Sequence, residues 1–137
     1  MTLIATKDRS PSDIIAYEAP SSMTGFSRKE LTVLGSATLA IGSVVKADGD
    51  GTWSELGSAA IATLAVDVAI VIDPKAEAGE FTAASDHKVL CMTQMGGVKR
   101  EFVTYTGTVN DANTDDLAEY FEANNMIRFE TSQDPIA

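Results

Sequence analysis

The chain has 137 residues, enough for one domain with one core and a short extension, and its 45% hydrophobic and 22% charged content is typical of a folded protein rather than a disordered one. Twenty acidic and ten basic side chains give a formal charge of −10, which argues against a protein that binds the phosphate backbone of nucleic acids. Cys91 is the only cysteine, so no intrachain disulfide can form, and the longest apolar-rich stretch, residues 59–72, is too short to cross a membrane.

Residues 1–27 contain Ser, Thr and Pro repeatedly and show no helical or alternating apolar pattern. They predict an extended arm that is disordered alone or ordered only on a partner. Residues 1–29 carry a net charge of +1 and the remaining residues −11, which hints at a separate role for the arm. Its apolar residues have no evident local core to join, so we expect them to contact a partner, the alternative being that they fold back on their own assembly: Ile14, Ile15, Tyr17, Met23 and Phe26.

After the arm, the pattern changes to short apolar runs separated by turn signals. Residues 30–34 and 43–47 each predict a strand. The sequence Asp-Gly-Asp-Gly at residues 48–51 is a concentrated turn signal, and residues 52–56 alternate again. These runs predict a β-hairpin with Trp53 on its packed face.

Residues 59–72 contain enough alanine for a helix, but Val66, Val68, Ile70 and Ile72 recur at every second position. This period favours a strand over residues 64–72. Asp73-Pro74 is expected to end that strand, because proline cannot donate to the hydrogen-bond ladder.

Gly96-Gly97 separates two further apolar runs, residues 87–95 and 98–105. Because glycine adopts positive φ without strain, the pair predicts the two-residue turn of a second hairpin. Phe102, in the second arm of that hairpin, is a candidate core residue.

One helix is predicted in the C-terminal half, opening at residues 113–116, where Asn113 or Thr114 can cap it and two aspartates suit the positive end of its dipole. Asn124-Asn125 predicts its end, and residues 126–130 alternate as a closing strand. The pattern predicts a mainly β (α+β) fold divided into an arm (1–27), a β-rich domain (28–131) and a polar tail (132–137). The expected core comprises Trp53, Val66, Val68, Phe102, Leu117, Tyr120, Phe121 and Ile127.

His87 is the only histidine, so a Ser-His-Asp or Cys-His site would need it as the base. Cys91 lies four residues further on, which on a strand puts both side chains on one face but roughly 13 Å apart. That separation is too long for a hydrogen bond, so we expect a surface histidine and a buried structural thiol. No catalytic residue is assigned.

The turn at residues 48–51 is similar to the start of a calcium loop, but the position for a bidentate glutamate holds Ala59. Residues 115–116 are explained by the charge preference of a helix N-terminus. The sequence contains neither a Gly-x-x-x-x-Gly-Lys nor a Gly-x-Gly-x-x-Gly loop. We therefore expect no metal, no cofactor and no direct contact with nucleic acid.

Several short segments carry a family resemblance through their order and spacing. They are residues 27–33 (SRKELTV), 41–45 (IGSVV) and 51–56 (GTWSEL), followed by the alanine-rich residues 62–67 and the ending 125–129 (NMIRF). Over residues 26–130 the chain resembles the head decoration proteins of tailed bacteriophages, the lambda-type capsid cement proteins. It departs from them in having Asn125 where glycine is usual, in a longer segment at 73–86, and in its arm.

The resemblance implies a small barrel-like or β-tulip domain that forms a homotrimer over three-fold and quasi-three-fold positions of a mature capsid. It also implies that the arm contacts the major capsid protein, of HK97-like fold, by adding backbone pairing to a capsid sheet. Three arms per trimer give avidity, and bridging of neighbouring subunits stabilises the head against packaged DNA. The expected location is the exterior of the virion capsid, after synthesis in the host cytoplasm and without membrane contact.

Three alternatives remain open. Another virion module, such as a tail or fibre component, would share the lack of catalytic residues. A carrier domain of the biotinyl type is suggested by residues 42–45 (GSVV), but it needs a lysine at a hairpin tip, and the two expected tips have none. A small hydrolase is the enzymatic alternative.

Overall fold

The computed structural model describes residues 14–18 and 27–130, and this part of the chain is a mainly β domain with one α-helix, as the sequence pattern predicts. Five of its strands close into a barrel, in agreement with the barrel-like domain that the resemblance implies. The strands and the helix run in this order: β1 (Ile15–Glu18), β2 (Arg28–Leu34), β3 (Val44–Ala47), β4 (Trp53–Glu55), β5 (Val68–Val71), β6 (Asp86–Met92), β7 (Gly96–Lys99), α3 (Asp111–Asn125) and β8 (Ile127–Glu130). Short 3-10 turns lie between them: η2 (Ser58–Thr63), η3 (Pro74–Ala76) and η4 (Arg100–Phe102).

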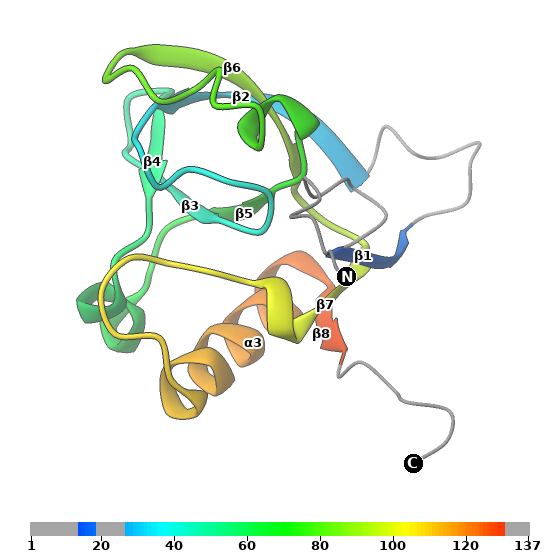
Figure 1. Cartoon of the computed structure of the whole chain (residues 1–137). Helices are drawn as coiled ribbons and strands as arrows, with labels where there is room; N and C mark the ends of the chain where they lie inside the picture. The colour runs from blue at the N-terminus through cyan, green and yellow to red at the C-terminus, as the bar shows by residue number, and fades with distance from the viewer. Residues whose placement is uncertain (1–13, 19–26, 131–137) are drawn as a thin grey trace, which may run out of the picture.

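The barrel closes in the strand order β2-β4-β3-β5-β6, with β6 returning to β2 along an antiparallel ladder. The predicted hairpin is confirmed: β3 and β4 pair antiparallel around the Asp48–Gly51 turn, where Gly49 and Gly51 both have φ of 90°. A single parallel pair, Val33 with Trp53, joins β4 to β2 and completes the ring. In Figure 1 this barrel lies above the helix and the second sheet.

The barrel wall separates two hydrophobic cores, and its strands alternate between them. On β5, Ala69 and Val71 lie in the core inside the barrel, whereas Val68 and Ile70 lie in the core outside it. All four side chains are therefore buried, which explains the nearly continuous apolar run that the sequence shows there.

The outer core lies between the barrel, the helix and a three-stranded sheet in the order β1-β7-β8 (Figure 1). Leu117 and Phe121 of α3 are fully buried in it, and the Phe121 ring lies 5.3 Å from that of Phe129 on β8. Thr114, also on the buried face, shares a 2.8 Å hydrogen bond with the Tyr105 hydroxyl. The helix thus joins the sheet to the barrel through one apolar face.

The helix cap lies three residues before Asn113, the first of the two expected caps. The cap is Asn110, whose Oδ1 accepts a 2.8 Å hydrogen bond from the backbone N–H of Asn113, so neither Asn113 nor Thr114 has that role. The helix ends at Asn125, in agreement with the predicted stop, and Met126 follows it in the left-handed region with φ of 56°.

The predicted strand over residues 64–72 is too long at its start, and Val66 is not a core residue. Val66 is 41% exposed and precedes β5, which begins only at Val68. Its carbonyl oxygen accepts a 2.6 Å hydrogen bond from the Tyr120 hydroxyl, so the backbone at this position is tied to α3 rather than to a barrel strand. Val66 fits the two-residue period of the sequence, but it lies in a bend between η2 and β5 and not in a strand.

The predicted turn at Gly96-Gly97 is also wrong. Both glycines are buried inside β7, which pairs with β1 and β8 and not with β6. The positive φ of this region is adopted by Met95 instead, at 58°. Glycine inside a strand allows close approach of neighbouring backbone, and here strands lie on both sides of the pair.

Of the other expected core residues, four are fully or almost fully buried: Val68, Leu117, Phe121 and Ile127. Three are half-buried and pack against a core from its rim: Trp53 on the inner core, and Phe102 and Tyr120 on the outer one.

Candidate functional site

The N-terminal strand belongs to the folded domain. β1 pairs antiparallel with β7, with Ile15 opposite Val98 and Glu18 opposite Gly96. The expected boundary between an arm of residues 1–27 and a domain starting at residue 28 is therefore wrong for residues 14–18, because their backbone completes a sheet of that domain.

Ile14 is a core residue, and the expectation that it contacts a partner is wrong. It is fully buried in the outer core, and Ile15 is half-buried against the same core. Gly42 supports this arrangement: it has φ of 98°, and an added Cβ would collide with the carbonyl oxygen of Phe102 and touch the Ile14 side chain.

The remaining arm residues have different positions. Tyr17 lies on β1, while Met23 and Phe26 lie outside the described residues.

β1 forms one edge of the three-stranded sheet, with β7 at the centre and β8 at the other edge. In the part of the chain that the structure describes, no further strand pairs with β1. An edge strand has one row of backbone N–H and C=O groups turned away from its partner, and such a row can pair with a strand of another chain. The edge of β1 is therefore a candidate docking site for an extended segment.

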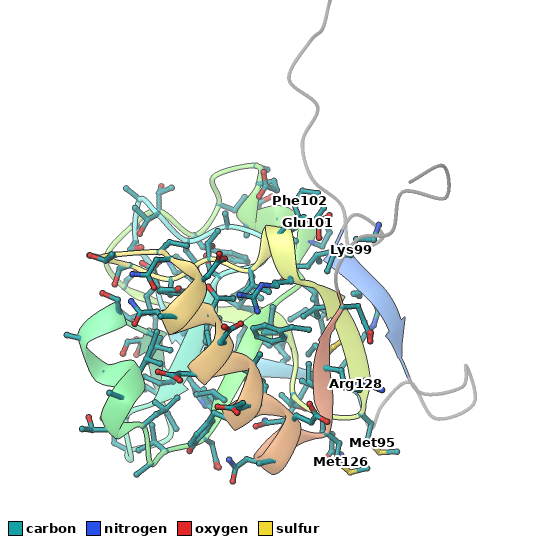
Figure 2. The ribbon with its side chains drawn as sticks, turned by 90° about the horizontal axis from the view of Figure 1, so that it is seen from below. Met95, Lys99, Glu101, Phe102, Met126 and Arg128 are labelled. Carbon is teal, nitrogen blue, oxygen red and sulfur yellow. The ribbon has the colours of Figure 1, made fainter. Side chains whose placement is uncertain are left out.

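Two methionines lie at the end of this sheet where β7 and β8 begin and β1 ends. Met95 directly precedes β7 and Met126 directly precedes β8, and Figure 2 shows their side chains near one another. Backbone hydrogen bonds hold them in place: the Met95 N–H donates to Asn125 O at 3.0 Å, and the Gly96 N–H donates to Met126 O at 3.2 Å. Met126 is 66% exposed.

Both methionines of this pair have left-handed backbone conformations, with φ of 58° and 56°. Such conformations are uncommon for residues other than glycine and cost free energy. An unbranched thioether adapts its shape to an apolar surface, so the methionine pair can serve as a deformable contact beside the open edge of β1.

At the opposite end of β7, the charged residues Lys99 and Glu101 lie near Phe102 in Figure 2. The guanidinium of Arg100 contacts the Asp115 carboxylate at 2.8 Å and ties η4 to the first turns of α3. An exposed pair of this kind contributes little stability, so its main effect is to orient the two elements.

The residues that could have formed a catalytic pair have separate structural roles. Cys91 is fully buried in the inner core, and burial, with a smaller contribution from the Asp73 carboxylate, raises the pKa of its thiol well above the usual range. His87 lies on the same strand, where its Nε2 is 3.1 Å from the carbonyl oxygen of Ala83 and its ring packs against Phe81. The thiol is thus held in its unreactive form, away from solvent.

Asp73 is buried, and both of its carboxylate oxygens accept backbone hydrogen bonds, from Lys75 at 3.0 Å and Leu90 at 3.1 Å. It therefore caps η3 and fixes β6. Within residues 14–18 and 27–130, no three His, Cys, Asp or Glu side chains gather closely enough to hold a metal ion. No helix in this part of the chain has the length and apolar character needed to span a bilayer.

Comparison with family models, curated proteins and solved structures returned no significant match to this chain. The methionine pair was not foreseen from the sequence. One signal was available: a methionine, rather than glycine, directly follows the predicted helix stop at Asn124-Asn125.

Proposed function

We propose that the chain is a structural virion protein that binds the outside of a bacteriophage capsid as a homotrimer and stabilises the head. The single observation that carries the proposal is the edge of β1, which pairs with no further strand among the described residues and lies beside the exposed Met126 and the half-buried Met95. A strand of the major capsid protein, paired to this edge, would extend the three-stranded sheet by β-augmentation. Backbone pairing gives the affinity, and the methionines contribute apolar contact.

The order of short motifs over residues 26–130 supports the same proposal, because it resembles that of head decoration proteins. Ile14 and the pairing with β7 fix β1 in the domain, so the proposed docking edge is already formed before a capsid strand binds. Three such edges in one trimer bind cooperatively through effective concentration, which allows each contact to be weak. A ligand that binds only the assembled shell stabilises it by mass action.

The test is co-sedimentation of the purified chain with expanded capsids of the phage that encodes it. We expect saturable recovery in the capsid pellet. Because Ile14 is part of the core, the truncation that tests the arm removes residues 1–13 and retains β1. This variant should remain folded and trimeric, and because it keeps the β1 edge and the methionine pair, it should lose less than about tenfold in capsid affinity, equivalent to about 1.4 kcal/mol. A larger loss would place the main contact in residues 1–13 and not at the β1 edge.

A second variant tests the methionine pair. Met126→Glu places a charge at the proposed contact, and Leu34→Glu is its matched control, because Leu34 is also an exposed apolar residue (44%) but lies on the barrel. We expect Met126→Glu to weaken capsid binding and Leu34→Glu to bind like the unmodified chain. Equal capsid affinity of the two variants would show that the methionine pair is not part of the interface. Recovery with tails or fibres instead of heads would overturn the capsid assignment in favour of another virion module.

A further inference from the structure

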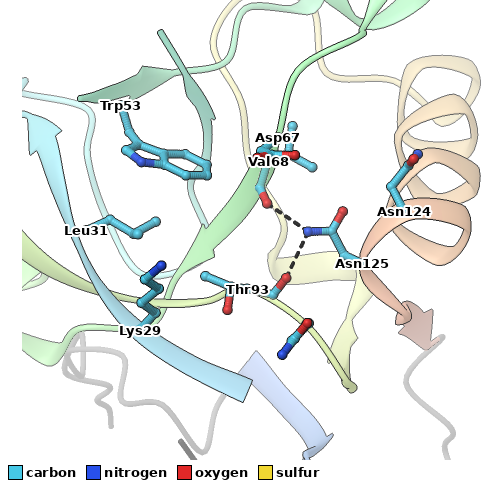
Figure 3. Close-up of a pocket in the computed structure, with 9 residues that line it drawn as sticks. Lys29, Leu31, Trp53, Asp67, Val68, Thr93, Asn124 and Asn125 are labelled. Atoms are coloured by element: carbon cyan, nitrogen blue, oxygen red, sulfur yellow. Dashed lines mark hydrogen bonds between the residues drawn. The ribbon is translucent and has the colours of Figure 1, made fainter. Parts of the chain in front are cut away.

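A pocket of about 340 Å³ lies between the barrel and the end of α3. Its lining comes from β2, β4, the start of β5, the segment after β6 and the last turn of the helix. Figure 3 shows Trp53 and Leu31 on one side of this pocket and Asn124 and Asn125 on the other. Six of its nine lining residues are polar or charged, whereas sites for apolar ligands are lined mainly by hydrophobic side chains.

The apolar side of the pocket is built on Trp53. The indole is half-buried and packs against the inner core of the barrel, which limits its movement. Its remaining surface borders the pocket together with Leu31. Trp53 therefore gives the pocket a rigid aromatic surface.

The opposite side carries a fixed hydrogen-bond acceptor. The side-chain nitrogen of Asn125 donates to the carbonyl oxygens of Val68, at 3.0 Å, and Thr93, at 2.8 Å. Both amide hydrogens are therefore used within the fold, and the amide cannot rotate without losing them. The Asn125 Oδ1 atom is left as an acceptor. The side-chain nitrogen of Asn124 makes one hydrogen bond, to the carbonyl oxygen of Tyr120 in the same helix, at 3.0 Å.

The charges of the pocket balance. Lys29 and Asp67 are both exposed lining residues, and no ion pair joins either of them to another described residue. One positive and one negative group give no net attraction for a phosphate or for a simple cation. They can instead donate to and accept from the hydroxyl groups of a neutral ligand.

We propose that this pocket binds a pyranose residue of a neutral saccharide. One apolar face of the sugar ring would lie on Trp53, and its hydroxyls would bond to Asn125 Oδ1, Asp67 and Lys29. Each sugar hydroxyl both donates and accepts hydrogen bonds, so it can pair with the acceptors as well as with the donor of the pocket lining. The volume is at the lower end of that of small-molecule sites and suits one or two sugar rings.

Trp53 is the only tryptophan in the chain, so its fluorescence and its indole N–H signal in a ¹H–¹⁵N spectrum report on this pocket alone. The probes are glucose, galactose, N-acetylglucosamine and the N-acetylglucosamine tetramer. Each is titrated to 50 mM or to its solubility limit, because we expect a Kd on the order of millimolar. Sorbitol serves as the acyclic control and glycine as the zwitterionic one. We expect at least one cyclic sugar to shift the indole signal saturably and sorbitol and glycine to leave it unchanged. Binding of the tetramer alone would identify a glycan chain as the source, and binding of a monosaccharide a free sugar.

Two matched variants locate the binding. Asp67→Ala removes a proposed acceptor, and Asp116→Ala removes another exposed carboxylate, on α3 and outside the pocket lining. We expect Asp67→Ala to weaken sugar binding at least fivefold and Asp116→Ala to leave it unchanged. The proposal is overturned if no sugar shifts the indole signal, if glycine shifts it instead, or if both variants bind alike. Since the titration contains no capsids, its outcome is independent of the proposed capsid function.

Discussion

The two hydrophobic cores of the molecule are built from different parts of the chain and from different side chains. The inner core is filled mainly by medium-sized and small residues of the barrel strands, such as Val45, Ala69 and Cys91. The outer core contains larger ones, including Phe121 and Ile14, and it joins β1 near the N-terminus to β8 near the C-terminus. Both parts depend on long-range pairing, since the barrel closes through the ladder between β2 and β6, but the outer layer contains the most distant pairing, that of β1 with β7.

This difference predicts where truncation is tolerated. A deletion that reaches Ile14 removes part of the outer core as well as any surface contact, so loss of binding in such a variant would not identify an interface. A deletion that stops before it leaves both cores complete.

The largest expected effect is that of Phe121→Ala in the outer core. Removal of the buried ring should lower the free energy of unfolding by about 3–5 kcal/mol, because the cavity is too large to collapse completely. Val89→Ala in the inner core should cost less, about 1.5–3 kcal/mol. Urea midpoints at unchanged m-value measure both. A reversed order would show that the barrel, and not the outer layer, is the more tightly packed part.

Ile14→Ala tests whether the N-terminal strand contributes to the outer core. We expect a loss of about 2–4 kcal/mol, whereas Ile15→Ala, at a half-buried position, should cost clearly less. Denaturant unfolding of the two variants side by side provides the comparison. An Ile14→Ala variant as stable as the unmodified chain would place β1 outside the cooperative domain.

The inner core can be examined through pH. Burial raises the pKa of the Cys91 thiol in the folded state, while in the unfolded chain it titrates near its usual value of about 8.5. Below about pH 8.5 both states are protonated and the full stability is present. Above it only the unfolded state releases the proton, so stability falls by about 1.4 kcal/mol per pH unit.

The control for this pH dependence is Cys91→Val, which lacks the titrating group. The difference in unfolding free energy between the two proteins should shift between pH 7.5 and pH 9.5 in favour of the variant. A constant difference would mean that the thiol reaches solvent in the folded protein.

The smallest expected effect concerns the methionine pair, and unlike the core substitutions it is an increase in the free energy of unfolding. Met126→Gly should stabilise the protein by about 0.5–1 kcal/mol, because glycine adopts the left-handed conformation without strain and the lost side chain is mostly exposed. Thermal unfolding and capsid co-sedimentation should therefore change in opposite directions. A destabilised variant would show that the Met126 side chain packs within the domain.

The parts of the fold that the sequence made predictable are those with a local signal. The turn glycines between β3 and β4 and the apolar face of α3 follow short-range rules, and both are found in the structure. The sheet β1-β7-β8 could not be predicted, because β1 pairs with a strand about 80 residues away and β8 with one 31 residues away, and such pairing leaves no period in the sequence. For the same reason Gly96-Gly97 was interpreted as a turn rather than as the centre of that sheet.

The candidate sites, like the fold, could be predicted only where the sequence signal is local. A surface role for the N-terminal apolar residues was a reasonable inference from their isolated positions, but for Ile14 the partner is the domain itself. The pocket depends on Asn125, whose two hydrogen bonds link α3 to β5 and to the segment after β6. Nothing in the sequence near Asn125 identifies those distant carbonyl groups.

The most direct test of the proposed function is sedimentation of the unmodified chain with expanded capsids, after its mass in solution has been measured by light scattering. A particle of three times the chain mass that saturates a fixed number of capsid sites is the predicted result. A monomer that stays in the supernatant at every capsid concentration would contradict the proposal.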